Sequence, residues 1–243
     1  MERYARQMLL PEIGPEGQAR LGNAKIAVVG AGGLGCAALP YLAAAGIGEI
    51  TVIDDGVIAE TDLHRQILYT ARDVGAQKAE TAAKRLAEQT PRIKVAAAAE
   101  RLSAVNARQL LAGKTLALDC SDNFPTRKIL NRACIQLKVK CVYAAVYRWE
   151  GQLAVFNPAY GPCYECLYPA TACDRHGSCS DYGVCGPVAG AMGAFQAAEA
   201  IKLIAAGKSA LEGKLWLFDV LSCETKTINL AKNPACAACS KGA

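Results

Sequence analysis

Apolar runs and helical patterns alternate along the first 147 residues of this 243-residue chain. Short β-branched runs predict strands, and segments with apolar residues three or four positions apart predict helices. The expected strands are 25–29, 49–54, 93–99, 115–119 and 141–146, and the helices between them are 36–45, 75–89, 104–112 and 125–137. Strands that alternate with helices in this way favour an α/β fold: a Rossmann-like, mostly parallel twisted sheet with helices on both faces.

The pattern changes after residue 147. Glu150–Asn157 alternates between polar and apolar residues, which predicts the start of an antiparallel extension, completed by strands 214–219 and 224–230. A long apolar helix is expected at 188–206, after Pro187 and before Gly207. Its spacing predicts a buried face made of Ala191, Phe195, Ala198, Ile201 and Ile204, with Glu199 and Lys202 outside. Two short amphipathic helices, 3–10 and 17–21, precede the first strand.

Composition narrows the class of protein. With 52% hydrophobic residues the chain can bury a full core, and its formal charge of +5 is scattered rather than clustered, which argues against nucleic-acid binding. The uncharged stretch 26–48 contains several glycines and Pro40, so a buried strand, loop and helix explain it better than a membrane span. The N-terminal segment has no apolar signal region, and we expect a cytoplasmic protein.

Cysteine is unusually frequent, with twelve residues. Disulfides are typical of small secreted proteins, so metal binding or thiol chemistry is the better account here. Two Cys-x-x-Cys pairs, Cys163 with Cys166 and Cys236 with Cys239, have the spacing of tetrahedral zinc ligands. The long interval between the pairs predicts a structural Zn²⁺ that attaches the C-terminal segment to the loop after Cys166, whereas one disulfide within each pair would be strained.

A glycine-rich loop follows the first strand and contains Gly30, Gly32, Gly33 and Gly35. Glycines permit close approach to the backbone, and free amides of the following helix face an anion with the positive end of the helix dipole. Asp54, at the end of the next strand, supplies the acidic residue that such loops require about 20 positions later. The loop therefore predicts a nucleotide-phosphate site, and the alternative is a tight turn without a ligand.

Polar residues follow several of the predicted strands, where ligands of parallel sheets bind. Arg65 and Lys78 are the cations nearest the glycine loop in sequence, and either could instead be a solvated surface residue. Asp119 and Asp122 follow strand 115–119 and suit Mg²⁺, which usually takes one or two carboxylates beside a polyphosphate. A helix N-cap is the alternative role for Asp122.

Several spaced motifs now form a set: Arg3–Gln7, Gly30–Gly35, Asp62–Gln66, Asp119–Asn123 and the two Cys-x-x-Cys pairs. In this order they resemble the E1-like ThiF/MoeB family, the adenylyltransferases that activate ubiquitin-like sulfur carriers. The resemblance extends from Arg3 to Cys239. Segments 65–69, 183–187 and 215–219 look more like ThiF than MoeB.

The resemblance implies ATP, Mg²⁺ and Zn²⁺ as cofactors and assigns roles to individual residues. The implied nucleotide-binding residues are Gly30, Gly32, Gly33, Gly35, Asp54, Asp62, Arg65, Gln66, Lys78 and Asp122, with Gly33 against the phosphates, Asp54 on the ribose and Asp122 on magnesium. Arg65 and Lys78 would neutralise phosphate charge. Arg6 matches an arginine that reaches into the active site of the other subunit of a homodimer.

Two positions depart from the family pattern. Asp62 stands where the family usually has Asn, and Gly56 stands where a second acidic residue is common. A carboxylate near phosphates adds repulsion unless Asp62 is protonated, turns away or joins the metal shell. The departure puts the nucleotide pose on that side in question.

The implied chemistry needs no catalytic base, because a carrier's C-terminal carboxylate is already ionised at neutral pH. Positioning and charge stabilisation then carry the step. Of the two histidines, His64 and His176, neither has a triad-like setting, and we interpret His64 as a surface residue. Cys179, in a small and polar loop at 168–187, matches the cysteine that can bond covalently to the carrier in ThiF-like proteins. An ordinary loop cysteine is the alternative.

The resulting hypothesis is a single adenylation domain, 1–243. It comprises N-terminal helices (1–24), a nucleotide-binding half (25–147) and a carrier-binding and zinc half (148–243) with the crossover loop 168–187. The enzyme would activate the C-terminal Gly-Gly of a ThiS-like sulfur carrier in thiamine thiazole synthesis. Because no rhodanese-like segment follows, sulfur would come from a separate persulfide donor, a cysteine desulfurase or a rhodanese-type protein. The alternatives are MoeB-type activation of the small subunit of molybdopterin synthase, an NAD-dependent oxidoreductase and a non-catalytic carrier-binding scaffold.

Overall fold

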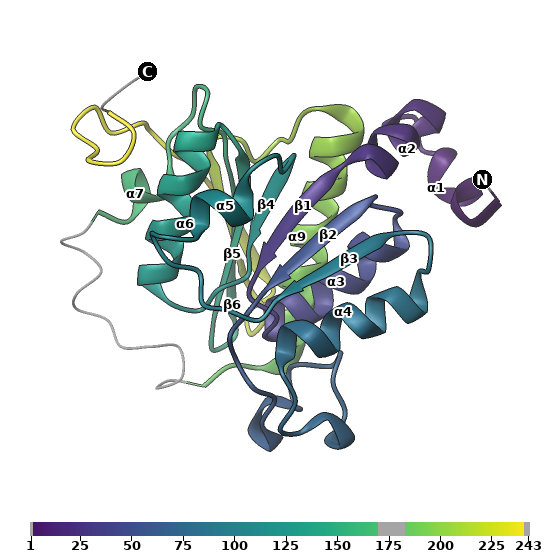
Figure 1. Cartoon of the computed structure of the whole chain (residues 1–243). Helices are drawn as coiled ribbons and strands as arrows, with labels where there is room; N and C mark the ends of the chain where they lie inside the picture. Colours follow the sequence, from purple (N-terminus) through teal and green to yellow (C-terminus); the bar gives the residue numbers. More distant parts are fainter. Residues whose placement is uncertain (1, 170–182, 241–243) are drawn as a thin grey trace.

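The computed structural model describes residues 2–169 and 183–240. Within them, eight strands form one mixed sheet in the order β3-β2-β1-β4-β5-β6-β7-β8 (Figure 1). The strands are β1 (Lys25–Val29), β2 (Glu49–Ile53), β3 (Lys94–Ala98), β4 (Leu116–Asp119), β5 (Lys140–Tyr147), β6 (Glu150–Phe156), β7 (Lys214–Asp219) and β8 (Glu224–Asn229). The first five pair in parallel and the last three are antiparallel, which confirms the predicted α/β class and its extension.

Helices cover both faces of the parallel part of the sheet. The described helices are η1 (Glu2–Tyr4), α1 (Ala5–Met8), α2 (Gly14–Asn23), α3 (Gly33–Ala44), η2 (Glu60–Asp62), η3 (Ala71–Asp73), α4 (Lys78–Gln89), α5 (Ala107–Leu111), α6 (Phe124–Leu137), α7 (Tyr164–Leu167) and α9 (Gly186–Ala206). Residues of α3, α4 and α9 share one buried cluster, and residues of α5 and α6 share the other. The sheet therefore separates two hydrophobic cores.

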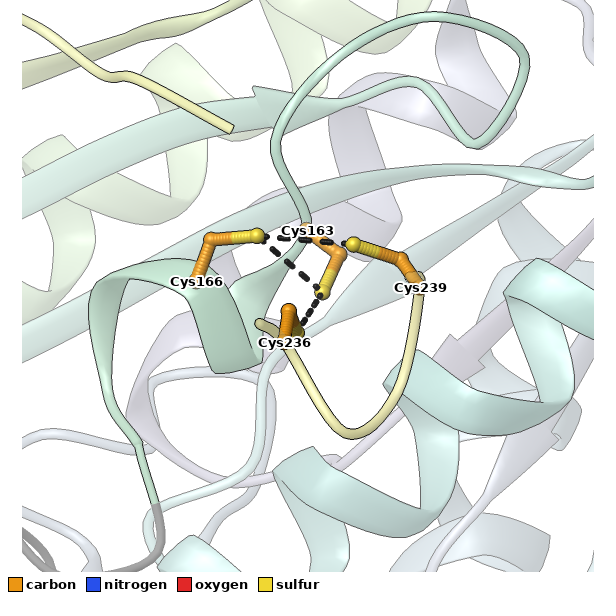
Figure 2. A group of neighbouring side chains, drawn as sticks. All are labelled: Cys163, Cys166, Cys236 and Cys239. Carbon is orange, nitrogen blue, oxygen red and sulfur yellow. Dashed lines mark hydrogen bonds between the residues drawn. The ribbon is translucent and has the colours of Figure 1, made fainter. Parts of the chain in front are cut away.

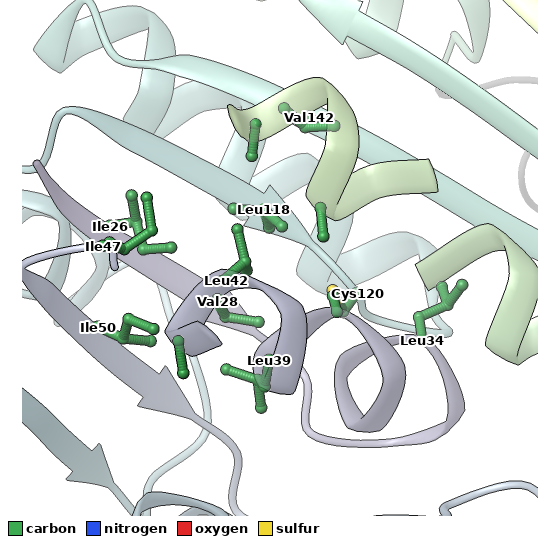
Figure 3. Packing of buried hydrophobic residues seen from close by; sticks show 14 of the residues in the cluster. Ile26, Val28, Leu34, Leu39, Leu42, Ile47, Ile50, Leu118, Cys120 and Val142 are labelled. Atoms are coloured by element: carbon green, nitrogen blue, oxygen red, sulfur yellow. The ribbon is translucent and has the colours of Figure 1, made fainter. Parts of the chain in front are cut away.

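Successive side chains of the central strands point to opposite faces of the sheet and so pack in these two cores in turn. Ile26 and Val28 of β1 pack on the side of Leu39 and Leu42 of α3 (Figure 3), whereas Ala27 belongs to the opposite cluster. Because both faces are buried, the strand is apolar throughout rather than alternately polar. The uncharged stretch 26–48 is thus the centre of a buried sheet and its first covering helix.

The predicted burial of α9 is confirmed only in part, since Ala191 and Ile201 are half-buried and Lys202 is exposed as predicted. Phe195 and Ala198 are exposed and Glu199 is buried, while Ile204 is buried as expected. Small residues of α9 form its contact surface with α3. A Cβ added at Gly193 would lie 2.3 Å from the carbonyl oxygen of Leu34 on α3. The prediction placed the large apolar residues inward, but close helix packing requires small ones.

Helix α9 is also long and apolar enough to cross a membrane by length and composition, the one such helix among residues 2–169 and 183–240. In this fold 61% of its most apolar window is buried, and it packs against α3 and the sheet. Burial of this kind is typical of a core helix and removes the need for a lipid environment.

Five cysteines outside the two pairs were predicted to be small core residues. Cys36, Cys120, Cys134 and Cys141 are buried, as expected. Cys223 is exposed, and its φ of 58° places it in the left-handed region of a turn between β7 and β8. The prediction for Cys223 is wrong because the apolar pattern there belongs to the two strands and not to the turn that joins them.

Candidate active site and metal centre

A cleft of about 560 Å³ opens where the strands β1, β2 and β4 end. Parallel strands leave such a crevice where the connections to their helices diverge. Eight of the predicted nucleotide-binding residues line it: Gly30, Gly32, Gly33, Asp54, Arg65, Gln66, Lys78 and Asp122. Gly35 and Asp62 lie behind these residues and are not part of the lining.

The glycine loop has two kinds of glycine. Gly30 has a φ of 100°, and a Cβ added there would lie 2.5 Å from the carbonyl oxygen of Cys120. A Cβ at Gly35 would lie 2.1 Å from the carbonyl oxygen of Gly30. Backbone packing therefore requires these two glycines. Gly32 and Gly33 instead face the cleft, where α3 begins and its first amides lack partners within the helix.

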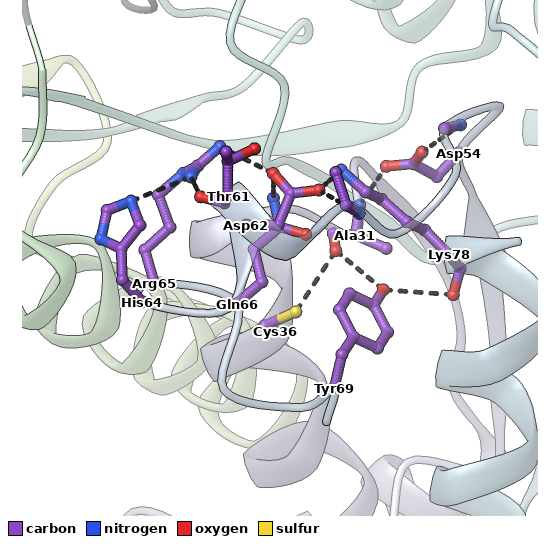
Figure 4. Close-up of polar contacts among 12 residues, drawn as sticks. Ala31, Cys36, Asp54, Thr61, Asp62, His64, Arg65, Gln66, Tyr69 and Lys78 are labelled. Atoms are coloured by element: carbon purple, nitrogen blue, oxygen red, sulfur yellow. Dashed lines mark hydrogen bonds and ion pairs between the residues drawn. The ribbon is translucent and has the colours of Figure 1, made fainter. Parts of the chain in front are cut away.

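Tyr69 holds the loop in place from behind. Its hydroxyl lies 2.9 Å from the carbonyl oxygen of Ala31 and 3.1 Å from that of Lys78, so its one proton is shared between the glycine loop and the start of α4 (Figure 4). The Cys36 thiol donates to the same Ala31 oxygen at 3.3 Å, and burial raises the pKa of this thiol to about 12. Sequence reasoning did not assign Tyr69 a role, although its position three residues after Gln66 lies within the segment that resembles ThiF.

Asp54 also fixes the loop. Its Oδ2 accepts from the Ala31 amide and its Oδ1 from the Gly56 amide, both at 2.7 Å. A Cβ at Gly56 would lie 2.9 Å from Asp54 Oδ1 and 3.2 Å from the Cδ of Lys78. An acidic side chain at position 56 would therefore require Asp54 and Lys78 to shift from their positions here.

Asp62 contacts both cations of the cleft (Figure 4). Its Oδ1 accepts from Arg65 Nη2 at 2.9 Å, and its Oδ2 lies 3.0 Å from Lys78 Nζ. Burial opposes ionisation, but hydrogen bonds from Lys78 and the Ala59 amide, with the charges of Lys78 and Arg65, hold the pKa of Asp62 below its ordinary value. The carboxylate is thus ionised and faces two cations, so the repulsion expected from the sequence is balanced inside the protein.

His64 extends this cluster to the surface. Its Nε2 lies 3.1 Å from Arg65 Nη1, which also donates to the carbonyl oxygen of Thr61 at 2.9 Å. The ring is exposed at the rim of the cleft. Its position agrees with the interpretation of His64 as a surface residue, and its contact helps to orient Arg65.

The two aspartates after β4 have different surroundings. Asp122 is exposed and lines the cleft, whereas Asp119 is buried and accepts from the amide and hydroxyl of Ser121 at 3.1 and 2.6 Å. Burial raises the pKa of Asp119. The N-cap of α6 is Asn123, whose side chain accepts from the Thr126 amide at 3.0 Å. Asp122 is therefore not the cap, and its carboxylate is available to the cleft.

Arg127 supports the Asp122 loop from below. It is buried, lines the cleft, donates through Nη2 to the carbonyl oxygen of Ser121 at 2.9 Å and lies 5.3 Å above the ring of Tyr143. Sequence reasoning missed this residue because an arginine in the first turns of a helix reads as a surface cation. The structure shows it between the Asp122 loop and an aromatic ring.

Gln196 of α9 connects two strands beneath the cleft. Its Nε2 donates to the carbonyl oxygens of Asp119 and Val142, both at 2.8 Å, and its Oε1 accepts from the Cys120 thiol at 3.2 Å. It is fully buried. An uncharged polar residue in the first half of the apolar segment 188–206, ahead of Glu199 and Lys202, is the signal that could have found it.

Arg6 lies far from the cleft of its own chain. It is exposed on α1, and the next residue, Gln7, donates to the carbonyl oxygen of Ala45 at 3.1 Å, just beyond the end of α3. The cleft lies at the start of α3, and a helix of this length separates its ends by about 18 Å. Figure 1 shows α1 beside the beginning of the strands. Cys179 and His176 lie outside the described residues.

The four cysteines of the two predicted pairs meet in one cluster (Figure 2). The Sγ atoms are 3.9 Å apart for Cys163 and Cys166, 3.6 Å for Cys163 and Cys236, and 3.5 Å for Cys166 and Cys239. Zinc–sulfur bonds of about 2.3 Å in a tetrahedron place sulfurs about 3.8 Å apart. The cluster is compatible with a zinc site, and its sulfurs are too far apart for a disulfide.

Further groups orient these thiols. Asn131 Nδ2 lies 3.6 Å from Cys163 Sγ, and the amide of Asn233 donates to Cys166 Sγ at 3.4 Å. Glu165, between the first two cysteines, forms a two-bond pair with Arg132 of α6, with both distances 2.9 Å. The cluster thus joins α6, the α7 segment and the C-terminal segment.

Comparisons with known proteins cover nearly the whole chain. A model of the ThiF family matches residues 4–238. A sulfur carrier protein adenylyltransferase of Thermus thermophilus is 42% identical over 245 residues, covering 98% of this chain and 90% of the relative. The SAMP-activating enzyme E1 of Haloferax volcanii is 40% identical over 243 residues, covering 100% of this chain and 90% of the relative.

Among solved structures, E. coli MccB with succinimide matches with a TM-score of 0.85. Its sequence is 24% identical, and the match covers 98% of this chain and 73% of that one. At this identity the likeness concerns the fold alone. The mixed sheet and its covering helices are therefore shared with that structure.

Proposed function

This chain belongs to the ThiF family, and from that premise we propose that it is an ATP-dependent adenylyltransferase that activates the C-terminal carboxylate of a sulfur carrier protein. The relative named a sulfur carrier protein adenylyltransferase is 42% identical over almost the full chain, which supports both the reaction and the class of substrate. The carrier would resemble ubiquitin and end in Gly-Gly. The products would be a carrier acyl-adenylate and pyrophosphate.

One observation carries the proposal: glycine-loop amides, two cations and an exposed carboxylate line the same cleft. Arg65 and Lys78 would spread charge from the phosphates, and Gly32 and Gly33 would allow the phosphates to approach the backbone. Asp122 would hold Mg²⁺, which supplies further neutralisation of phosphate charge when bound. Asp54 would orient the ribose hydroxyls.

The chain's own residues then act by positioning. The carrier carboxylate attacks the α-phosphate of ATP, a bond forms between carboxylate oxygen and phosphorus, and the bond to the pyrophosphate oxygen breaks. Because the attacking group is already ionised, no proton has to be removed. The cations hold the leaving pyrophosphate, and catalysis depends on orientation and charge stabilisation.

Arg6 enters this proposal only through a second copy of the chain. It lies beyond the far end of α3 from its own cleft, so it could reach a nucleotide only in another subunit. We propose a homodimer in which Arg6 of each subunit completes the cleft of the other. An exposed Arg6 on a short helix at the edge of the fold agrees with this arrangement.

The four-cysteine site would have a structural role. Four thiolates complete the coordination of Zn²⁺, leaving no position for a substrate. A sulfur atom for the carrier would come from a separate persulfide donor and displace AMP. In this division of roles, residues 25–147 bind the nucleotide and residues 148–243 hold the carrier and the zinc, within one adenylation domain.

For the carrier we propose a ThiS-like protein of thiamine thiazole synthesis. The segments 65–69, 183–187 and 215–219 resemble ThiF, and this resemblance supports the choice over the small subunit of molybdopterin synthase. Incubation with ATP and each purified carrier, followed by mass spectrometry, tests it. Adenylation of the molybdopterin carrier alone would overturn the choice, and an added mass on a Cys179-containing peptide would support a covalent role for Cys179.

The decisive experiment for the activity is carrier-dependent exchange of pyrophosphate into ATP. We expect Asp122→Ala to lower exchange by at least about 10²-fold without unfolding the protein, because it removes the exposed carboxylate of the cleft. Glu88→Ala removes an exposed carboxylate of α4 outside the cleft and should leave exchange unchanged. Wild-type protein that binds NAD but shows no exchange would contradict the proposal.

A further inference from the structure

We propose that Asp62 is a positioning residue that serves as the shared internal counterion of Arg65 and Lys78 and does not touch the nucleotide. This inference rests on the proposed adenylyltransferase function, since it describes how that function's two phosphate-binding cations are held. It gives Asp62 a different place from the nucleotide-binding role that its motif suggests.

The geometry around Asp62 accounts for both of its oxygens. Oδ1 accepts from Arg65 Nη2 and from Gln66 Nε2, each at 2.9 Å. Oδ2 accepts from the Ala59 amide at 3.1 Å and lies 3.0 Å from Lys78 Nζ. Each oxygen therefore receives two donors, one of which belongs to a cation of the cleft.

Burial separates Asp62 from the ligand space. Its side chain is 10% exposed, against 14% for Lys78 and 28% for Arg65, and it is absent from the cleft lining that contains both cations. The cations thus stand between the carboxylate and a bound phosphate. A counterion in this position orients the cations before the nucleotide arrives.

Only a carboxylate satisfies this arrangement. All four neighbours of Asp62 are donors, and an ionised carboxylate accepts at both oxygens. An asparagine would turn an NH₂ group either toward Arg65 and Gln66 or toward Lys78 and the Ala59 amide. In both orientations one cation of the cleft would lose its partner.

Gln66 gains its orientation from the same contact. Because Asp62 only accepts, the amide nitrogen of Gln66 must face it, and Oε1 is left buried with no hydrogen-bond partner among the described residues. Gln66 also lines the cleft beside Gly32. Asp62 therefore contacts and orients three residues that surround the proposed phosphate site.

The charge balance has a functional consequence. Two cations and one buried carboxylate carry a net charge of one, so the cleft holds the phosphates without the full attraction of both cations. Removing the carboxylate charge leaves the cations more strongly attractive and less well placed. Affinity and turnover should therefore respond in opposite directions.

The test compares wild type with Asp62→Asn in two measurements, ATP affinity by calorimetry at low and high salt, and the kcat of carrier-dependent exchange. We expect kcat to fall by at least about tenfold because the cations are misplaced. The ATP dissociation constant should stay equal or become smaller at low salt. It should rise more steeply with added salt than in wild type, because one more charge is unbalanced.

The matched control is Asp73→Asn. Asp73 occupies the same third position of a 3₁₀ helix, accepts from the backbone amide of Thr70 at 2.7 Å and pairs with Arg85, but it lies outside the cleft. It should lose similar local contacts and leave kcat and the salt dependence unchanged. A control with the same kinetic change as Asp62→Asn would show a general loss of structure and would overturn the inference.

A double-substitution cycle decides whether Asp62 acts through its partner. In a Lys78→Met background, Asp62→Asn should change kcat by about threefold or less, because the positioned cation is already gone. An undiminished effect, or an Asp62→Asn protein identical to wild type, would overturn the inference. Absence of ATP binding or exchange by the wild type would instead overturn the proposed function, so the two failures are distinguishable.

Discussion

The cleft and the four-cysteine cluster are two polar sites built in opposite ways. The cleft forms where successive parallel strands end, and Asp54, Asp62 and Gln196 bond to backbone or to neighbouring side chains within the protein. The cluster joins Cys163 to Cys236, which is 73 positions away, and brings in a C-terminal segment that is largely exposed. The cleft should therefore keep its shape without a ligand, whereas the cluster should depend on one.

The largest effect is expected from a substitution that breaks the four-cysteine cluster. Cys236→Ser removes one of four thiolates, so we expect the zinc content measured by elemental analysis to fall from about one per chain to well below one. The unfolding free energy should drop by several kcal/mol, more than the ~1 kcal/mol typical of a point substitution. Hydrogen exchange should rise in residues 230–240.

Cys223→Ser is the matched control, since Cys223 is exposed and belongs to neither pair. It should leave zinc content and stability unchanged. The Cys236→Ser protein should still bind ATP at a temperature low enough for the destabilised protein to stay folded. Loss of ATP binding in a folded, zinc-free protein would contradict the independence of the two sites.

The second largest effect is expected from a substitution of Gln196, which supports the cleft from beneath. Gln196→Met removes the donor to the carbonyl oxygens of Asp119 and Val142 and leaves both buried without their partner. We expect a loss of about 2–4 kcal/mol in unfolding free energy, measured by urea denaturation. Gln18→Met provides a comparison, because Gln18 is also buried but contacts Ala45 away from the cleft. ATP affinity should fall in Gln196→Met but not in Gln18→Met. An equal loss of ATP affinity in both variants would contradict a specific role for Gln196.

A smaller effect tests the support of the glycine loop. Tyr69→Phe removes the hydroxyl whose proton is shared between Ala31 and Lys78 and should cost about 1 kcal/mol in stability. The loop would retain its contacts with Asp54 and Cys36. We expect a modest weakening of ATP affinity by calorimetry. A loss of unfolding free energy as large as that expected for Gln196→Met would mean that the hydroxyl contributes more than one ordinary hydrogen bond.

The smallest effect appears as a dependence on pH. Burial raises the pKa of Asp119 in the folded protein, so the folded state binds its proton more tightly than the unfolded state. Wild type should lose stability, relative to Asp119→Asn, as the pH rises above the ordinary carboxyl value of about 4. Urea denaturation of both proteins at pH 4 and pH 7 measures the difference. Wild type that keeps or gains stability relative to Asp119→Asn between pH 4 and pH 7 would contradict the direction of this shift.

Much of the fold could be predicted from the sequence. The strand predicted at 214–219 matches β7 at both ends, and the other seven predicted strands lie within one residue of those observed. Burial of α9 could not be predicted, because periodicity identifies large apolar residues and not the stripe of small ones that α3 approaches. Cys223 was misplaced for a related reason, since the turn after β7 interrupts the apolar pattern.

The sequence predicted which residues form the candidate site but not the contacts between them. The motifs indicated Asp54, Arg65, Lys78 and Asp122, and the structure places all four around one cleft. The pairing of Asp62 with Lys78 was not foreseeable, because Lys78 reaches it only after the chain folds back from η2 to the start of α4. The roles of these residues in catalysis stay predictions until the substitutions are measured.

Gly35 lies so close to the carbonyl of Gly30 that any side chain at position 35 would collide with the backbone of the turn. Efforts to redesign which nucleotide is accepted therefore have nothing to adjust there. Variation is better sought at Glu100, Arg101 and Leu102, which border the same space from a separate segment. We expect a library confined to these three codons to explore new base preferences while the turn proposed to bind the phosphates stays unchanged.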